Sequence, residues 1–220
     1  MLLTTAYFPP ISWFAAAAKE FTFSTEGVNS SLVYLEACEN YQKQSYRNRC
    51  KILTSNGIEN LNVPIIHDSG TYRHLITDIQ IDYSEPWVSR TKRAIASAYY
   101  SSPYFEYYKD DLFTLLELNY PTLWELNLNI IRFFMNKIGI YAQIVPTTEY
   151  TYKDSNIYGE DLRSIIHPKK QNTILESLEL KKPYFQVFSQ KYGFQYDLSI
   201  MDLLFCEGPD SISFLKKIQP

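Results

Sequence analysis

The sequence predicts an α/β fold with a mixed sheet, and three observations lead to this prediction. A strand pattern, a helix pattern and a second strand pattern follow one another in the first 36 residues, which is the order of an α/β unit. Asn56 and Gly57 form a preferred pair for a hairpin turn near the centre. Apolar residues then recur at helical spacing across residues 87–137, in about three helices. Since 45% of the 220 residues are hydrophobic, the chain can bury a core, and we predict one domain over residues 1–220.

The N-terminal strand-helix-strand unit is predicted from its proline break. Residues 2–7 have the pattern of a short strand, which Pro9 and Pro10 end. Pro10 suits the first turn of a helix, because the N–H that proline lacks would be unpaired there. Helical spacing continues to Lys19, and residues 31–35 then form a second strand that ends in Glu36.

The central hairpin is predicted from the turn pair and from the alternation on both sides of it. A two-residue turn at this pair places Ile52 opposite Leu61 and Cys50 opposite Val63, which gives the hairpin one apolar face. The turn chemistry and the hydrophobic pattern therefore agree on a register.

The same register predicts the polar face of the hairpin. Lys51 lies opposite Asn62, and side chains alternate along a strand, so Arg47 and Arg49 share the face of Lys51. Asn48 then points to the buried side, where its amide needs hydrogen-bond partners. Asn48 is therefore either a structural contact of the hairpin or part of a site.

The rest of the chain is read from its periodicity. Residues 79–83 alternate as a half-buried strand, the third helix ends near Gly139, and residues 140–145 form another strand. Residues 147–182 are polar, and we predict a mobile loop region there. Ser199 and Asp202 form a variant capping box at the start of a helix over residues 200–206, and a last helix covers residues 212–218.

The buried stripes of the three central helices are Trp87, Thr91, Ile95 and Ala98 in the first, Leu112, Leu115 and Leu116 in the second, and Leu123, Leu126, Ile130, Ile131 and Phe134 in the third.

Composition and charge argue against several classes of protein. The net charge is −3 and the pI is about 5.7, whereas proteins that bind nucleic acid usually present a basic face. The three cysteines and three histidines lack the spacings of a metal site, so neither a metal nor another cofactor is expected. The N-terminus lacks the pattern of a signal peptide, and no apolar run approaches the roughly 20 residues of a membrane span. We predict a cytoplasmic protein with an odd number of reduced cysteines.

One short segment concentrates positive charge. Residues 39–52 carry four cations against Glu39, interleaved with tyrosines and Asn48. Arginine and lysine bind phosphates and carboxylates, while tyrosine and asparagine bind hydroxyl groups. The segment has the chemistry of a site for an anion or a polyol.

Three segments together resemble the WbqC-like family. They are residues 7–14 (YFPPISWF), residues 43–64 (KQSYRNRCKI, then NG and LNVP) and residues 197–209 (DLSIMDLLF, then EGP). The combination in this order is specific, whereas each fragment alone is not. One departure stands out, because many members of that family place His-Gln-Pro before a Tyr-Leu-Pro core, and this chain has Leu3, Thr4 and Thr5 there. Ala6 fills a place that asparagine often holds.

The resemblance implies a setting in the synthesis of surface polysaccharides such as O-antigen. It implies a transferase that moves a glycyl or another acyl group to an activated sugar. Two alternatives stay open at this point: a binding module for an anionic or nucleotide-sugar ligand, and a structural protein that docks a partner. In the first two cases the partner is a small anionic molecule or a sugar nucleotide, and the oligomeric state is left open.

Candidate residues follow from this setting. Glu36, at the end of a strand, is the candidate catalytic base. Asp202 could also act as a base, but helix capping explains it more simply. The candidate substrate-binding residues are Asn48, Arg49, Arg47, Lys43, Tyr41, Tyr46 and Tyr7. The alternative for these residues is a solvated cationic strand with tyrosines at the edge of the core.

Overall fold

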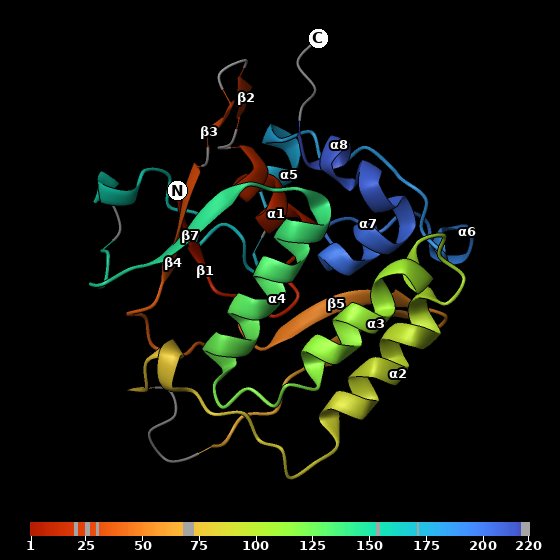
Figure 1. Cartoon of the computed structure of the whole chain (residues 1–220), viewed down its shortest axis with the longest axis horizontal. Coiled ribbons are helices and arrows are strands. Elements are labelled where there is room, and N and C mark those ends of the chain that lie inside the picture. Colours follow the sequence, from red (N-terminus) through yellow and green to blue (C-terminus); the bar gives the residue numbers. More distant parts are fainter. Residues whose placement is uncertain are drawn as a thin grey trace.

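The computed structural model has an α/β architecture, as predicted (Figure 1). It describes residues 1–19, 22–24, 27–29, 31–67, 73–152, 155–170 and 172–216. In chain order, the strands and helices are β1 (Leu2–Thr4), α1 (Ile11–Lys19), β2 (Thr22–Ser24), β3 (Gly27–Asn29), β4 (Ser31–Glu36), β5 (Arg49–Thr54), β6 (Gly57–Asn62), η2 (Ile76–Asp78), α2 (Trp87–Tyr99), α3 (Phe105–Leu116), α4 (Leu123–Ile138), β7 (Ala142–Pro146), η3 (Asn156–Tyr158), α5 (Ile174–Ser177), α6 (Ser189–Tyr192), α7 (Ile200–Glu207), η4 (Gly208–Asp210) and α8 (Ser211–Leu215).

A three-stranded parallel sheet lies near the N-terminal end of the described chain. Its strand order is β1-β4-β7, so β4 is in the middle, with Leu35 paired to Leu3 and Val33 paired to Ile144. Leu3, Val33 and Leu35 are buried, as expected for a parallel sheet covered by other elements. The strand-helix-strand unit is therefore confirmed. The antiparallel pairs β2-β3 and β5-β6 form sheets of their own.

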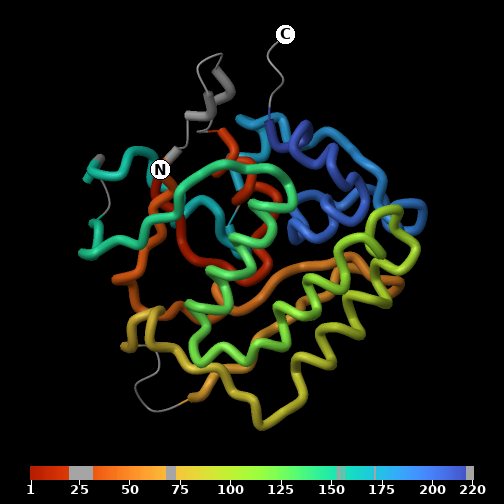
Figure 2. Tube along the Cα trace, in the orientation of Figure 1, coloured from red at the N-terminus to blue at the C-terminus, as the bar shows by residue number. Residues whose placement is uncertain are grey.

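The first helix packs against the last helices of the chain. Figure 2 shows the red N-terminal segment beside the blue C-terminal one, and α1 contacts both α7 and α8. Two backbone hydrogen bonds join these segments, from Ile11 N to Leu198 O at 3.0 Å and from Ile200 N to Pro9 O at 2.9 Å. Residues almost 190 positions apart thus form one unit.

The hairpin is confirmed, but its register differs from the prediction by two residues. Cys50 pairs with Leu61, and Thr54 pairs with Gly57, so the turn residues are Ser55 and Asn56. Gly57 alone takes a positive φ, of 104°, at the first position of β6. This arrangement corresponds to a hairpin loop in which glycine follows the turn, rather than to a two-residue turn with Asn-Gly at its centre. A register shift of two residues leaves every side chain on the same face of the hairpin, so the apolar face of β5 is still buried.

The pattern of the helical region is confirmed. All four predicted stripe residues of α2 and all five of α4 are buried, as are Leu112 and Leu116 of α3, whereas Leu115 is half-buried. The Thr122 side chain accepts a hydrogen bond from Glu125 N at 3.2 Å and caps α4, while Gly139 ends that helix with a φ of 83°. Helices α2 and α3 lie side by side at the lower right of Figure 1, and α4 lies beside α3 nearer the centre.

Several predicted boundaries were wrong. The first strand ends at Thr4 rather than at residue 7, and Phe8 has a φ of 42°, which an extended strand does not allow. Residues 79–83 do not form a strand; Gln80 and Ile81 make isolated bridges instead, although the predicted alternation of burial holds at Ile79 and Ile81. The last helix ends at Leu215, and residues 217–218 of its predicted range lie outside the described residues.

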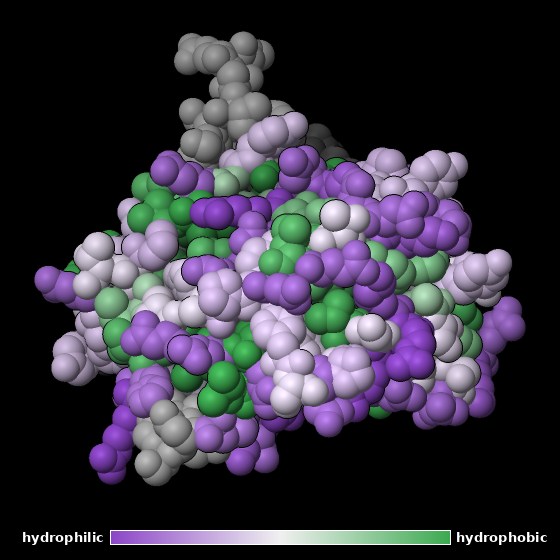
Figure 3. All heavy atoms as spheres, turned by 60° about the horizontal axis from the view of Figure 1, so that its bottom comes forward, coloured by the Kyte–Doolittle hydropathy of each residue, from purple (hydrophilic) through white to green (hydrophobic). Residues whose placement is uncertain are grey.

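The polar segment 147–182 contains η3 and α5, and its mobility stays a prediction. Hydrophilic and hydrophobic residues are interspersed over the face shown in Figure 3. Among the residues that the structure describes, no helix combines the length and the apolar character needed to cross a membrane.

Candidate functional site

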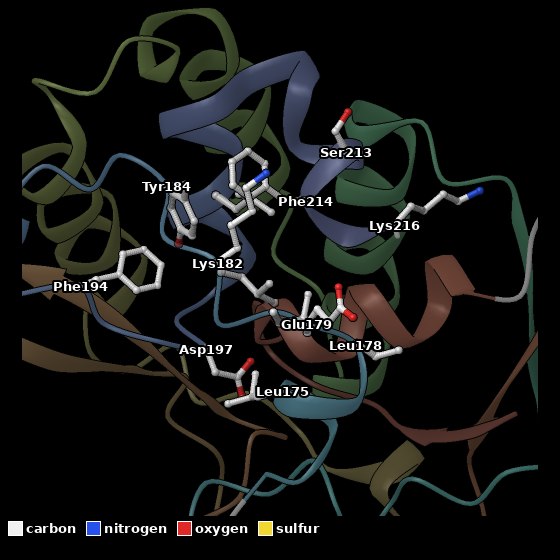
Figure 4. Close-up of a pocket in the computed structure, with 13 residues that line it drawn as sticks. Leu175, Leu178, Glu179, Lys182, Tyr184, Phe194, Asp197, Ser213, Phe214 and Lys216 are labelled. Atoms are coloured by element: carbon white, nitrogen blue, oxygen red, sulfur yellow. The ribbon is translucent and has the colours of Figure 1, made fainter. Parts of the chain in front are cut away.

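A cavity of about 290 Å³ opens beside α1, between the segment around α5 and helices α7 and α8 (Figure 4). Its size is close to the lower limit of about 300 Å³ for small-molecule sites. The lining combines leucines, aromatic rings and charged groups: Ile11, Leu175, Leu178, Glu179, Leu180, Lys182, Tyr184, Phe194, Asp197, Leu203, Ser213, Phe214 and Lys216.

Asp197 is one of two carboxylates on the lining of this cavity, and Glu179 is the other. Its backbone φ is 56°, a left-handed conformation that aspartate tolerates better than most residues. The side chain accepts hydrogen bonds at Oδ1 from Ser12 N (2.8 Å) and at Oδ2 from Ser12 Oγ (3.0 Å) and Asn172 Nδ2 (2.8 Å). The start of α1 and the segment before α5 thus fix the orientation of the carboxylate.

The surroundings of Asp197 act on its proton affinity in opposite directions. Burial raises the pKa of the Asp197 carboxyl above its usual value, while the bonds from Ser12 and Asn172 and the charge of Lys51 lower it. Burial is the largest of these effects. A carboxylate with a raised pKa beside a cavity is suited to accept a proton from a bound ligand.

An aromatic wall bounds the cavity on another side. Tyr184 contacts Phe194 edge to face at 5.0 Å between ring centroids, and Phe214 in the same manner at 5.5 Å. The ammonium of Lys182 lies 5.6 Å from the centroid of the Phe214 ring. The wall therefore already has a cation against one of its rings.

Behind this wall lies a second buried carboxylate, Asp202. Its Oδ2 accepts hydrogen bonds from the Tyr184 hydroxyl at 2.5 Å and from Gln186 Nε2 at 2.8 Å. Burial raises the pKa of Asp202 to about 6. The capping role predicted for Asp202 was wrong, because the Ser199 hydroxyl alone caps α7 by accepting from Met201 N at 3.3 Å.

Glu36 lies at the carboxyl end of β4, the edge at which open α/β sheets bind ligands. Its side chain is 0% exposed. Oε1 accepts from Thr147 Oγ1 (2.8 Å) and Cys38 N (3.0 Å), and Oε2 accepts from Arg163 Nη1 (2.5 Å) and Thr151 N (3.3 Å). Its catalytic role stays a prediction; in this arrangement it anchors Thr147, Thr151 and Arg163 to the sheet edge.

Arg47 does not lie on the exposed face of the hairpin, and that prediction was wrong. Arg47 is 3% exposed and Glu39 is 5% exposed, and Nε of Arg47 donates to Oε1 of Glu39 at 2.8 Å within a two-bond ion pair. Burial nevertheless raises the pKa of Glu39, because desolvation outweighs the attraction of Arg47. Asn127 Nδ2 also donates to Arg47 O at 2.8 Å, so the backbone of this segment is fixed to α4.

The other predicted binding residues fall into separate places. Tyr7, Tyr41 and Tyr46 are buried, and Tyr7 N donates to Tyr46 O at 2.8 Å. Lys43 is exposed. Burial and the charge of nearby Asp197 raise the pKa of Tyr46, so this tyrosine lies near the cavity, although it is not a lining residue.

Asn48 and Arg49 lie at the start of the hairpin. Asn48 precedes β5, which begins at Arg49, so strand alternation does not force these neighbours onto opposite faces. Asn48 Nδ2 donates to Val63 O at 3.1 Å, and its Oδ1 is buried without a partner among the described residues. The guanidinium of Arg49 also lacks a partner in the described parts of the chain, and its Nε is buried. Both groups keep hydrogen-bonding capacity for a ligand.

Sequence reasoning missed the residues that line the cavity. Asp197 belongs to a segment that carries the family resemblance, but its left-handed backbone and its bonds to Ser12 are not readable from spacing. The aromatic wall joins Tyr184 and Phe194 to Phe214, and no periodic pattern connects these positions. Within the described residues, no group of three or more metal-binding side chains is placed to share an ion.

Comparison with known proteins gives one family and one curated relative. The model of the WbqC-like protein family matches residues 6–177. An uncharacterized protein from Mycobacterium tuberculosis is 24% identical over 199 residues, which cover 80% of this chain and 84% of that protein. No solved structure matches the chain significantly.

Proposed function

Because the chain belongs to the WbqC-like protein family, we propose that it is a transferase of surface-polysaccharide synthesis that uses the Asp197 cavity. It moves a glycyl or another acyl group from an activated ester or thioester to a sugar that carries a phosphate. The observation that carries this proposal is the partly buried Asp197 carboxylate, oriented by Ser12 and Asn172 on the lining of a cavity of about 290 Å³. The family resemblance motivates the polysaccharide setting, and the cavity supports the proposed chemistry.

Asp197 is the general base of the proposed reaction. A hydroxyl or amino group of the sugar attacks the acyl carbon, and a new carbon–oxygen or carbon–nitrogen bond forms. The proton of the attacking group passes to the carboxylate of Asp197, and the leaving group departs with the electrons of the broken acyl bond. Burial raises the pKa of Asp197, which strengthens it as a proton acceptor.

The lysines of the lining bind the phosphate of the sugar. Lys182 and Lys216 both line the cavity, and an ammonium group neutralises a phosphate as a point charge. Figure 4 shows both side chains away from Asp197 and directed apart from each other, so a single phosphate binds at one of the two ammonium groups. This separation places the phosphate away from the base and the reacting group near it.

One observation favours a second candidate, a binding module without chemistry. The Asp197 oxygens already accept three hydrogen bonds, from two donors of Ser12 and from Asn172. A carboxylate in this environment can also serve only to bind a ligand. Turnover therefore has to be measured separately from binding.

The test is turnover of a panel of nucleotide-sugars and sugar phosphates with activated acyl donors, followed by mass spectrometry. Asp197→Asn is expected to lower kcat by about 10²- to 10⁴-fold, the usual contribution of a general base. Asp110→Asn, an exposed substitution on α3 outside the cavity, is the matched control and should keep the wild-type rate. Full turnover by a folded Asp197→Asn variant would remove the base assignment, and ligand binding without any turnover by wild type would favour the binding module.

A further inference from the structure

Arg49 has a half-buried guanidinium without a partner. No residue in the described parts of the chain forms a hydrogen bond or an ion pair with it, and its Nε is buried. Nε is the one guanidinium nitrogen that is buried, so the two Nη atoms at the end of the planar fork reach the surface. A polar group that loses hydration without gaining a partner destabilises the folded chain. The fork is therefore available to an acceptor from outside the chain.

The face of the hairpin around Arg49 carries donors and no carboxylate of its own. Arg49 lies opposite Asn62 in the register, and Lys51 lies opposite Asn60. Side chains alternate along a strand, so these four share one face, which we call the Arg49 face. Glu59, the acidic residue of the two strands, belongs to the other face. Both asparagines are exposed, so their amides can also donate to a ligand.

Lys51 already has a negative charge nearby. Ser199 N donates to Lys51 O at 2.9 Å, so the segment that contains Asp197 meets β5 at this residue. The charge of Lys51 lowers the pKa of the Asp197 carboxyl. Asp197 thus offsets part of the charge of Lys51, whereas Arg49 forms no ion pair with any described residue. The charge that is left for a ligand is that of Arg49.

We propose that Arg49 binds a phosphate group of a ligand on the Arg49 face. The two Nη atoms donate to two oxygens of the phosphate, the amide of Asn62 donates to a third, and Lys51 adds positive charge. A phosphate has enough oxygens for all of these donors, whereas a carboxylate has two. The inference goes beyond the proposed function, because this phosphate lies outside the Asp197 cavity and does not need Asp197 to act as a base.

Two kinds of ligand carry such a phosphate. A nucleotide-sugar has a diphosphate next to its sugar, and a thioester of coenzyme A has phosphates on the side of the acyl donor. Both share the phosphate chemistry that the Arg49 face recognises. The carrier is therefore identified by the ligand whose affinity depends on Arg49.

Isothermal titration of the full chain with inorganic diphosphate tests the site itself. Arg49→Gln removes the charge and the fork, and we expect the Kd to rise by about tenfold or more. Arg93→Gln is the matched control, because Arg93 is an exposed arginine of α2 whose Nε donates to Ser89 O in the same helix. This control should keep the wild-type Kd. Equal effects of the two variants would indicate general charge attraction and would overturn the inference.

Two further variants test where the diphosphate binds. Asp197→Asn should keep or tighten the Arg49-dependent binding, because it removes a negative charge near Lys51. A double variant, Lys182→Gln with Lys216→Gln, removes the lysines of the cavity lining and should also keep this binding. If the double variant lost binding while Arg49→Gln kept it, the anion would lie in the cavity and the inference would be wrong.

Thermal unfolding guards against a folding defect. Arg49→Gln breaks no hydrogen bond of the described chain, so without ligand it should melt at or above the wild-type temperature. Diphosphate should raise the melting temperature of wild type and of Arg93→Gln, but not that of Arg49→Gln. A clear loss of stability in Arg49→Gln without ligand would show a structural role and would overturn the inference.

Titrations with UDP-glucose and with coenzyme A then identify the carrier. An Arg49-dependent Kd for UDP-glucose assigns the site to a nucleotide-sugar, and one for coenzyme A assigns it to the acyl donor. A Kd that is independent of Arg49 for both ligands would contradict the phosphate site. None of these titrations measures acyl transfer, so a missing turnover would remove the transferase proposal alone, and an Arg49-independent Kd would remove the phosphate site alone.

Discussion

Arg163 donates a hydrogen bond from Nη1 to Oε2 of Glu36 at 2.5 Å, although the two residues are 127 positions apart in the chain. The side chain of Glu36 is 0% exposed and that of Arg163 is 10% exposed. Arg163 also binds Asp161 and the carbonyl of Thr151, so it ties the segment after β7 to the carboxyl end of β4.

Removing Arg163 should therefore destabilise the fold strongly. Arg163→Met leaves the Glu36 carboxylate buried with one charge partner fewer, which costs about 3–5 kcal/mol of unfolding free energy. Arg90→Met breaks a pair with Glu85 whose side chains are 54% and 65% exposed, and it should cost at most about 1 kcal/mol. Urea unfolding measures both, and similar losses for the two variants would contradict the anchoring role.

The pH dependence of stability should report Asp202. Its pKa is about 6 in the folded protein and near 3.8 when unfolded, so the folded state binds more protons between these values. The contribution of Asp202 to the free energy of unfolding is therefore fully present below pH 3.8. It is lost as pH rises towards 6, which lowers the free energy of unfolding by about 3 kcal/mol. Asp202→Asn removes this loss, because asparagine does not titrate. If the unfolding free energies of the variant and the wild type changed in parallel from pH 4 to 7, the assignment of this pH dependence to Asp202 would be wrong.

Gly208 should tolerate a methyl group less well than Gly193. Both have positive φ, 55° and 70°, so alanine is strained at either position. A Cβ at Gly208 would lie 2.5 Å from the Tyr104 ring, whereas a Cβ at Gly193 meets nothing within 4 Å. Gly208→Ala is expected to cost about 1–3 kcal/mol more than Gly193→Ala. Thermal unfolding decides the comparison, which fails if the two variants melt together.

Arg49 is predicted to bind a ligand through its planar guanidinium. Lysine keeps the charge but lacks the fork, so Arg49→Lys should weaken the affinity for UDP-glucose by about 1–3 kcal/mol at an unchanged melting temperature. Asn48→Ala is less informative, because Asn48 also bonds to the carbonyl of Val63. An unchanged affinity for Arg49→Lys would leave Arg49 as a hairpin residue without a ligand-binding role.

Helices α2 to α4 and strands β4 to β7 were readable because their signals are local. The buried stripe of α2, from Trp87 to Ala98, follows from periodicity alone, as does the end of α4 at Gly139. The hairpin register was missed because the turn depends on which residue takes a positive φ. Asn56 and Gly57 suggested two such residues, and only Gly57 has one.

Burial of charge was not readable, because it depends on contacts between distant segments. Arg47 looks like part of an exposed cationic run, yet the chain folds so that it pairs with Glu39 inside the protein. The cavity depends on the same kind of contact, since Asp197 is held by Ser12 from the other end of the sequence. Spacing along a chain does not encode either relationship.

The backbone bonds of Ile11 to Leu198 and of Pro9 to Ile200 also constrain how the protein forms on the ribosome. Helix α1 is synthesised before its partners α7 and α8, which leave the exit tunnel only after the long intervening segment has been translated. Sequence-distant contacts of this kind slow folding, because the intervening chain must close a long loop first. A nascent chain in which residues 197–207 have not yet emerged therefore exposes the apolar surface of α1, which makes it a substrate for chaperones and proteases until these residues pack against it.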